Sequence, residues 1–168
     1  MTRILLGCTI VAIVISLLFF IKQNPVPLKQ EETQLEEVPI YTLMGDSLIF
    51  NKDNYSKKLI LNFYGTACGL CLTEMNDIVS FSRKHKVSVL FITADSVEAI
   101  KKFTHELIKQ GITDERISFA KISLPNAKKL FGDLTVPQSI FINDNFRVVD
   151  RKKGIITYSF LKRCFEKS

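Results

Sequence analysis

Tryptophan is absent from this 168-residue chain, histidine occurs only twice and cysteine only four times. Cys68 and Cys71 are close together, whereas Cys8 and Cys164 lie near opposite ends of the chain. Four scattered cysteines are too few for a fold held together by disulfide bonds. A zinc site is also disfavoured, because no second Cys-x-x-Cys and no closely spaced histidine pair is present. We therefore expect neither a metal ion nor a cofactor.

Charge is distributed unevenly along the chain, whose net charge is +6. Residues 1–37 carry a net charge of −1, which leaves +7 for the remainder. A basic surface favours acidic partners or membrane headgroups, but the same charge also simply keeps a domain solvated. Lysine and arginine are spread out and are not interleaved with aromatic residues, which argues against nucleic-acid binding.

The stretch from Ile4 to Ile21 is apolar or small at every position and carries no charge. Its 18 residues are at the lower limit for crossing a bilayer core of ~30 Å. No small-residue cleavage site follows, so a transmembrane anchor at residues 1–22 is favoured over a cleaved signal peptide. A lipoprotein signal ending at Cys8 is disfavoured, because too few apolar residues precede this cysteine. Arg3 favours a short internal tail and an exported remainder, although Lys22 opposes that orientation.

A polar segment with two prolines, residues 23–37, is typical of an exposed tether. The folded domain is expected at residues 38–168. Its predicted strands are Pro39–Leu43, Ser47–Phe50, Lys58–Tyr64, Val87–Thr93, Ile117–Ile122, Ser139–Asn143 and Arg147–Arg151. Its predicted helices are Leu72–His85, the segment between a Ser96 cap and Gly111, Asn126–Phe131 and Thr157–Phe165. This order predicts an α/β or α+β sandwich with a mixed central sheet flanked by helices.

The cysteine pair follows a buried strand and a small turn, Gly65-Thr66-Ala67, and precedes a helix. At a helix N-terminus, outward backbone N–H groups and the helix dipole favour a thiolate, which is the nucleophilic form of cysteine. Cys68 is therefore the predicted attacking thiol. Cys71, one turn into the helix, is placed to resolve a mixed disulfide on Cys68. Gly69 leaves the backbone bare for the approach of a partner chain.

Other interpretations of the pair remain open. Cys68 and Cys71 are also compatible with a static structural disulfide, or with a redox-inactive binding or scaffold module at the membrane. A peroxide-reducing site is disfavoured, because that chemistry uses a proline upstream at a spacing that Tyr64 to Ala67 does not provide. A copper chaperone would have a wider cysteine pair and a histidine ligand.

Two motifs resemble a known family. Residues 61–71 (LNFYGTACGLC), followed by LTEM, resemble the thioredoxin-like proteins of the TlpA/ResA type, which are membrane-tethered and extracytoplasmic. Residues 135–142 (TVPQSIFI) resemble the second signature of that family, in which a cis-proline faces the cysteine pair. The resemblance spans about Val38 to Phe165 and implies a thioredoxin-like fold. It also implies a cis bond between Val136 and Pro137, with backbone groups of Val136 pairing with an extended substrate.

The resemblance further implies thiol–disulfide exchange on protein substrates, as a reductase or isomerase, in a single-pass protein of the bacterial cytoplasmic membrane. Its domain would face the periplasm or exterior and receive electrons from a membrane or periplasmic donor. The chain departs from the family at Ala67, where a tryptophan is usual, and at Leu70, where many relatives have proline. Asn62 replaces a strand aspartate found in thioredoxin itself, so no proton acceptor for Cys71 is evident. Cys164 is expected to be a buried, inert thiol.

Overall fold

The computed structural model describes residues 35–166 except residues 54, 56 and 113, all within the unit Glu32–Ser168. The strands are β1 (Val38–Tyr41), β2 (Ser47–Phe50), β3 (Leu59–Phe63), β4 (Ser88–Thr93), β5 (Ile117–Lys121), β6 (Gln138–Ile142) and β7 (Val148–Lys153). The helices are α2 (Gly69–His85), α3 (Val97–Lys109), α4 (Leu124–Phe131) and α5 (Tyr158–Glu166). Each strand and helix predicted for the domain is present, with ends that differ by a few residues.

The strands form one mixed sheet in the order β2-β1-β5-β4-β3-β6-β7. Strands β3, β4 and β5 are parallel, whereas β6 runs antiparallel to β3 and β1 runs antiparallel to β5. Every residue of β3 and β6 is buried, as the continuous apolar run at Lys58–Tyr64 predicts for a central strand. The carboxyl ends of the parallel strands therefore meet the start of β6 at one edge of the sheet.

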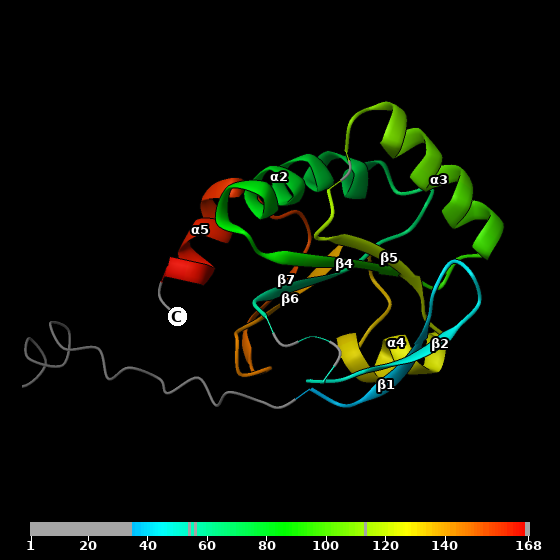
Figure 1. Cartoon of the computed structure of the whole chain (residues 1–168), viewed down its shortest axis with the longest axis horizontal. Coiled ribbons are helices and arrows are strands. Elements are labelled where there is room, and N and C mark those ends of the chain that lie inside the picture. Colours follow the sequence, from blue (N-terminus) through cyan, green and yellow to red (C-terminus); the bar gives the residue numbers. More distant parts are fainter. Residues whose placement is uncertain (1–34, 54, 56, 113, 167–168) are drawn as a thin grey trace, which may run out of the picture. The chain divides into compact units, whose positions relative to one another are not determined.

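Helices cover both faces of this sheet. α2, α3 and α5 lie over one face and α4 lies over the other (Figure 1). The first face is packed with aromatic and branched side chains that include Phe81, Phe91 and Phe141. The second face is packed around Phe63 and Phe131, whose rings stack with centroids 5.0 Å apart. The predicted α/β class with a mixed central sheet is thus confirmed.

Two helices differ from their predicted form. α2 begins at Gly69 rather than Leu72, because Cys68 is already its N-cap and its sulfur accepts the Cys71 N–H. On α3, the sequence pattern of Ile100, Phe103, Leu107 and Ile108 predicts one apolar face, but Ile108 is 58% exposed. Ile100 and Leu107 of the same helix are buried. Ile108 follows Leu107 directly, and one residue turns a helix by about 100°, which carries its side chain off that face.

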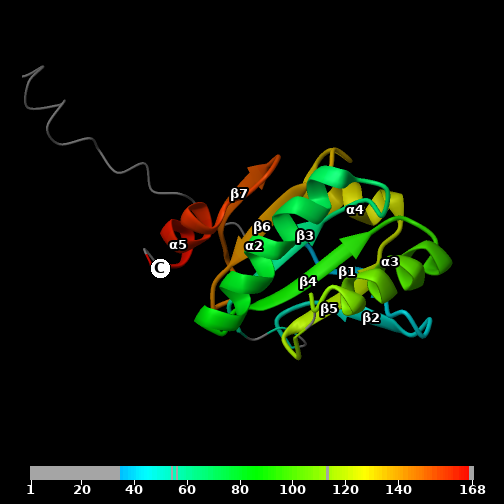
Figure 2. The same ribbon diagram turned by 90° about the horizontal axis from the view of Figure 1, so that it is seen from above.

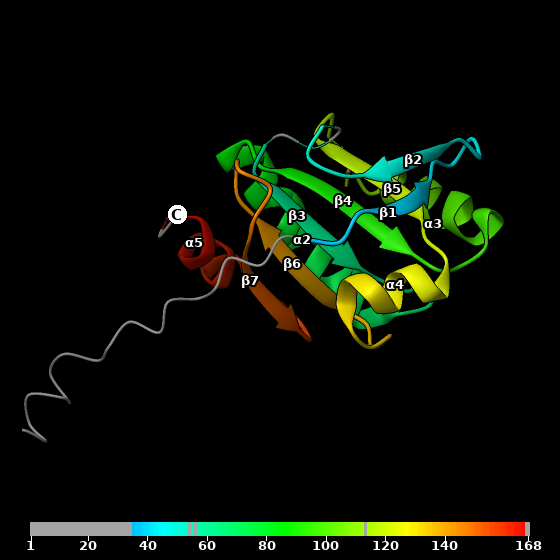
Figure 3. The ribbon, with the colours of Figure 1, turned by 90° about the horizontal axis from the view of Figure 1, so that it is seen from below.

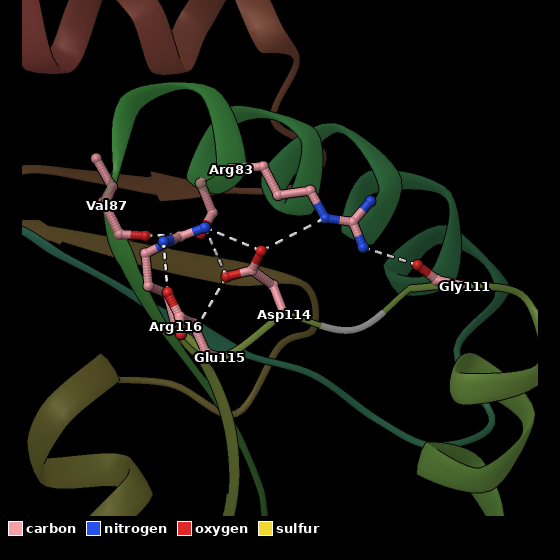
Figure 4. A network of polar contacts seen from close by, with 7 residues as sticks. Arg83, Val87, Gly111, Asp114, Glu115 and Arg116 are labelled. Atoms are coloured by element: carbon pink, nitrogen blue, oxygen red, sulfur yellow. Dashed lines mark hydrogen bonds and ion pairs between the residues drawn. The ribbon is translucent and has the colours of Figure 1, made fainter.

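The far end of α2 is fixed by a polar network (Figure 4). Arg83 of α2 donates to the Gly111 carbonyl at 2.8 Å, and its Nε lies 3.7 Å from a carboxylate oxygen of Asp114. Arg116, the residue before β5, pairs with Asp114 at 2.9 Å and with Glu115 at 3.0 Å. These contacts hold the C-terminal end of α2 against the α3–β5 connection, at the opposite end of the helix from the cysteines.

Most of the predicted N-terminal features lie outside the described residues. This holds for the anchor at residues 1–22, including Ile4–Ile21, and for the tether up to residue 34. Between residues 35 and 166, apart from the three positions not described, no helix combines the length and apolar character needed to cross a membrane.

Candidate active site

Cys68 and Cys71 are joined by a disulfide at the N-terminus of α2, with their Cα atoms 5.3 Å apart. Cys68 has an extended backbone and caps the helix, as the sequence predicts for a residue at or before the first turn. Its sulfur accepts a hydrogen bond from the Cys71 N–H at 3.1 Å. Cys71 is fully buried, whereas Cys68 is half-buried and Gly69 and Leu70 are exposed. Of the two sulfurs, that of Cys68 is therefore the accessible one, and the N–H group that it accepts would stabilise its thiolate.

The turn before Cys68 is held by Asp95, which follows β4. One carboxylate oxygen of Asp95 accepts both the backbone N–H and the hydroxyl of Thr66, each at 2.7 Å. Partial burial alone would raise the pKa of Asp95, but the hydrogen bonds from Thr66 and Thr93 more than offset this and lower it. Cys68 N–H in turn donates to the Gly65 carbonyl at 3.0 Å. The turn is thus tied to the end of a neighbouring strand.

Val136 and Pro137 lie across from Cys68, and the predicted cis bond between them is confirmed. A Cβ atom placed on Gly65 would lie 3.6 Å from Cys68 Cβ and 3.7 Å from a methyl group of Val136. Gly65 therefore separates the cysteine from the cis-proline loop, and a larger residue there would fill the gap between them. The turn before α2 and the start of β6 are far apart in the chain. They meet where β3 ends, because the end of β3 pairs with the start of β6 (Figure 2).

The loop before Pro137 is braced by Asp133 and Gln138. One oxygen of Asp133 accepts the Thr135 N–H at 3.1 Å and the Thr135 hydroxyl at 2.7 Å. The buried Gln138 amide donates to the same carboxylate at 2.7 Å and to the Thr135 carbonyl at 2.5 Å. Lys153 of β7 forms an ion pair with Asp133, and the hydrogen bond from Lys153 and those from Thr135 lower the pKa of Asp133. The loop that presents Val136 is therefore joined to the edge strand β7 by an ion pair between exposed side chains.

Glu74 is the residue that the sequence analysis missed. It lies three residues after Cys71 on the same face of α2 and is only 1% exposed. Asn62 of β3 donates to one of its oxygens at 2.7 Å, and the Ile156 N–H donates to the other at 3.0 Å. Burial raises the pKa of Glu74, although these two hydrogen bonds act in the opposite direction. A signal was present in the sequence: residue 74 falls on the helical stripe formed by Cys71, Ile78 and Ser82.

The Asn62 side chain gives this cluster two possible hydrogen-bonding arrangements. Its Nδ2 also donates to the Ser139 hydroxyl at 2.9 Å, while its buried Oδ1 has no partner among the described residues. The nitrogen and oxygen of an amide are assigned from such networks. Nδ2 donates to an ionised Glu74, whereas Oδ1 would accept the proton of a neutral Glu74 after the amide turned over. Asn62 can therefore accompany Glu74 in both protonation states.

The remaining candidate residues have structural roles. Tyr64 is 1% exposed and stacks on Phe103, so it belongs to the core and not to a substrate surface. Cys164 was expected to be buried, but it is half-buried, and its sulfur lies 3.6 Å from an Asp150 oxygen. The two histidines are exposed helix residues. Within the described part of the chain, no three potential metal ligands come together.

Comparison with solved structures identifies the fold as thioredoxin-like. The DsbE protein of Chlorobium tepidum, described as a putative thiol:disulfide interchange protein, superposes with a TM-score of 0.66 at 18% identity, over 81% of this chain and 95% of that one. A DsbF homologue from Corynebacterium diphtheriae gives a TM-score of 0.65 at 21% identity, over 83% and 89%. StoA from Bacillus subtilis gives 0.57 at 20% identity, over 77% and 96%. No protein-family model and no curated protein matches the sequence.

Proposed function

We propose that this protein is a thiol–disulfide oxidoreductase that acts on protein substrates through Cys68 and Cys71, as a reductase or isomerase. One observation carries the proposal: an accessible cysteine caps α2, is bonded to a buried cysteine one turn later, and faces a cis-proline loop. The thioredoxin-like fold and the similarity to thiol:disulfide interchange proteins support it.

In the reducing direction, the Cys68 thiolate attacks one sulfur of a substrate disulfide. A bond forms between Cys68 and the substrate, and the other substrate sulfur leaves as a thiolate that takes up a proton. The Cys71 thiolate then attacks the Cys68 sulfur and releases the second substrate thiol. Two electrons pass to the substrate and the Cys68–Cys71 disulfide is formed. A dithiol donor in or near the membrane would then reduce it again.

Glu74 would accept the proton that Cys71 loses before it attacks. Cys71 is fully buried, so forming its thiolate without a neighbouring base is unfavourable. Glu74 is the next titratable group along the same face of the helix. Because its pKa is raised, that pKa lies closer to neutral pH than the pKa of an ordinary glutamate does. Asn62 and the Ile156 N–H stabilise the ionised form, so a proton can move on and off Glu74 without leaving an unpaired charge.

The substrate would dock between the cysteine pair and the cis-proline loop. Gly69 offers no side chain, and apart from its chain neighbours and the nearby helix backbone, nothing lies within 4 Å of where its Cβ would be. Leu70 and Leu134 are 57% and 40% exposed, which provides apolar contact surface beside the disulfide. Backbone groups of Val136 would pair with an extended substrate segment.

We also propose that Ile4–Ile21 anchors the protein in a bacterial cytoplasmic membrane, with the domain on the periplasmic or external side as in TlpA/ResA-type proteins. The uncharged apolar run and the polar segment after it support this topology. Fusing a reporter enzyme that is active only outside the cytoplasm to the C-terminus tests it. Activity supports export of the domain, and silence of a stable fusion overturns it.

The reaction is tested with serine substitutions in the full chain. Cys71→Ser should accumulate a mixed disulfide with substrate proteins in cells, because the resolving thiol is missing, and mass spectrometry would identify them. Cys68→Ser should abolish insulin reduction. Cys164→Ser is the matched control and should react as the wild type does. If Cys68→Ser keeps full activity, the mechanism is wrong. If it keeps only the binding of a partner and the cellular phenotype, the protein is a redox-inactive scaffold.

A further inference from the structure

A pocket of about 150 Å³ lies behind the cis-proline loop, between the end of α4 and strand β7. Figure 3 shows the end of α4 beside the end of this edge strand. The lining residues are Phe131, Gln138, Ser139, Ile140, Arg151, Lys152 and Lys153. The volume is well above what a single water molecule requires, so the pocket can admit a side chain. Gln138 directly follows Pro137, which places the pocket next to the proposed docking loop.

Positive charge dominates the lining, which holds three cationic residues and no carboxylate. Two of these charges are already engaged. Lys153 is paired with Asp133, and the Lys152 ammonium lies 5.9 Å from the centre of the Phe160 ring. Arg151 differs from both, because its side chain has only one hydrogen-bond partner among the described residues, the backbone carbonyl of Leu130 at 2.7 Å. The remaining guanidinium N–H groups of Arg151 are therefore available to a ligand.

The surroundings of Arg151 suit a carboxylate. Arg151 as a residue is exposed, but its guanidinium is partly covered, and this partial burial lowers the pKa of the group. The hydrogen bond to Leu130 fixes its position at the end of α4, and Phe131 and Ile140 provide apolar walls. A guanidinium held in place presents paired N–H groups that match the two oxygens of a carboxylate, and partial shielding strengthens such bonds.

We propose that this pocket binds an acidic side chain of the polypeptide substrate, within a few residues of the cysteine that Cys68 attacks. The inference rests on the proposed exchange reaction and adds to it a preference for substrate sequence. A substrate segment lying along Val136 passes the loop that Gln138 braces, and extended chain advances about 3.3 Å per residue. Arg151 pairs with Ile140, three residues after Pro137, so a glutamate or aspartate a few residues from the target cysteine would reach it.

Symmetric disulfide dimers of single-cysteine peptides test this preference. The peptides carry glutamate, glutamine or lysine at one of the five positions on either side of the cysteine. The reduced full chain should reduce the glutamate peptide faster than the glutamine peptide at one or two positions, by about fivefold in kcat/KM, as expected for a charge-assisted contact near the surface. The lysine peptide should be the slowest.

Substitutions at Arg151 should change the preference and not the chemistry. Arg151→Gln should remove the advantage of glutamate, Arg151→Lys should keep most of it, and Arg151→Glu should reverse it in favour of lysine. Lys129→Gln removes an exposed positive charge from α4 that does not line the pocket, and this matched control should retain it. If the wild-type protein reduces the three peptides at equal rates, the inference is overturned and the exchange reaction still stands. Equal losses in Arg151→Gln and Lys129→Gln overturn it too, because they indicate attraction by the whole basic surface. If the wild-type protein reduces none of the peptides, the proposed function itself is overturned.

Discussion

At the residue scale, the burial of Glu74 is the most consequential feature of the molecule. Burying a carboxyl group is unfavourable unless neighbouring groups replace the hydrogen bonds that it made with water. Glu74 is 1% exposed and receives two such hydrogen bonds. Those neighbours, Asn62 and Ile156, come from the central strand and from the segment before α5. Through the Glu74 side chain, α2 is therefore connected to two separate parts of the chain near the buried cysteine.

Replacing Glu74 with glutamine should change how stability depends on pH. The raised pKa means that the folded protein holds this proton more tightly than the unfolded chain does. The resulting stabilisation is fully present below the ordinary carboxyl pKa of about 4.3, and it is lost as pH rises through the folded value. Each tenfold difference in acidity is worth about 1.4 kcal/mol. Urea unfolding from pH 4 to 8 should therefore show a decline in the wild type that Glu74→Gln lacks.

Two further measurements decide this prediction. Glu37→Gln removes an exposed carboxyl and should leave the wild-type decline unchanged. In Glu74→Gln, the part of the pH dependence that comes from the Glu74 carboxyl should also disappear from the rate at which Cys71 resolves a mixed disulfide on Cys68. Parallel stability curves for the wild type and Glu74→Gln would show that Glu74 does not titrate differently in the fold.

At the scale of secondary-structure elements, the turn between β3 and α2 depends on a single carboxylate. Replacing Asp95 with alanine removes the acceptor of both Thr66 hydrogen bonds and should cost about 1–3 kcal/mol of unfolding free energy. Because the pKa of Asp95 is lowered, its contribution is present above the ordinary carboxyl pKa and is lost as pH falls through the folded value. Disulfide exchange should also slow, since the turn positions Cys68.

A double-mutant cycle identifies the source of that loss. Thr66→Ala removes the hydroxyl donor, and the Thr66→Ala/Asp95→Ala double variant should be little less stable than Asp95→Ala alone. Urea unfolding at pH 7 measures all three variants. Strictly additive losses would show that the two side chains contribute independently and that the carboxylate does not act through the Thr66 hydroxyl.

The elements themselves follow from local sequence, whereas the contacts that join them do not. Apolar runs and helical stripes predicted every strand and helix of the domain, and the turn before two cysteines predicted where the disulfide meets α2. Ile108 was misplaced because a stripe of adjacent apolar residues does not show where it ends. Asp95 and Thr66 are 29 residues apart, and Asn62 and Ser139 are 77 apart. Such pairs depend on which strands become neighbours in the sheet, and the periodicity of each segment does not encode that order.

At the scale of the whole molecule, the relative stability of the oxidised and reduced protein reports the direction of the chemistry. The disulfide closes a very short loop, for which chain entropy predicts about 2 kcal/mol of stabilisation. Cys68 is the N-cap of α2, so the helix N-terminus stabilises a Cys68 thiolate, by about 0.3–1 kcal/mol. Cys71, being buried, gains nothing as a thiolate. The oxidised form should therefore be the more stable, by about 1–2 kcal/mol.

Urea unfolding of the full chain, with and without excess dithiothreitol, measures this difference. A more stable oxidised form means that the folded pair is harder to reduce than the unfolded pair, which suits a protein that donates electrons to substrates. The Cys68→Ser/Cys71→Ser double variant should unfold near the reduced midpoint and should not respond to dithiothreitol. A reduced form more stable than the oxidised form would instead require strong stabilisation of the Cys68 thiolate. That result would make the protein an oxidant of its substrates.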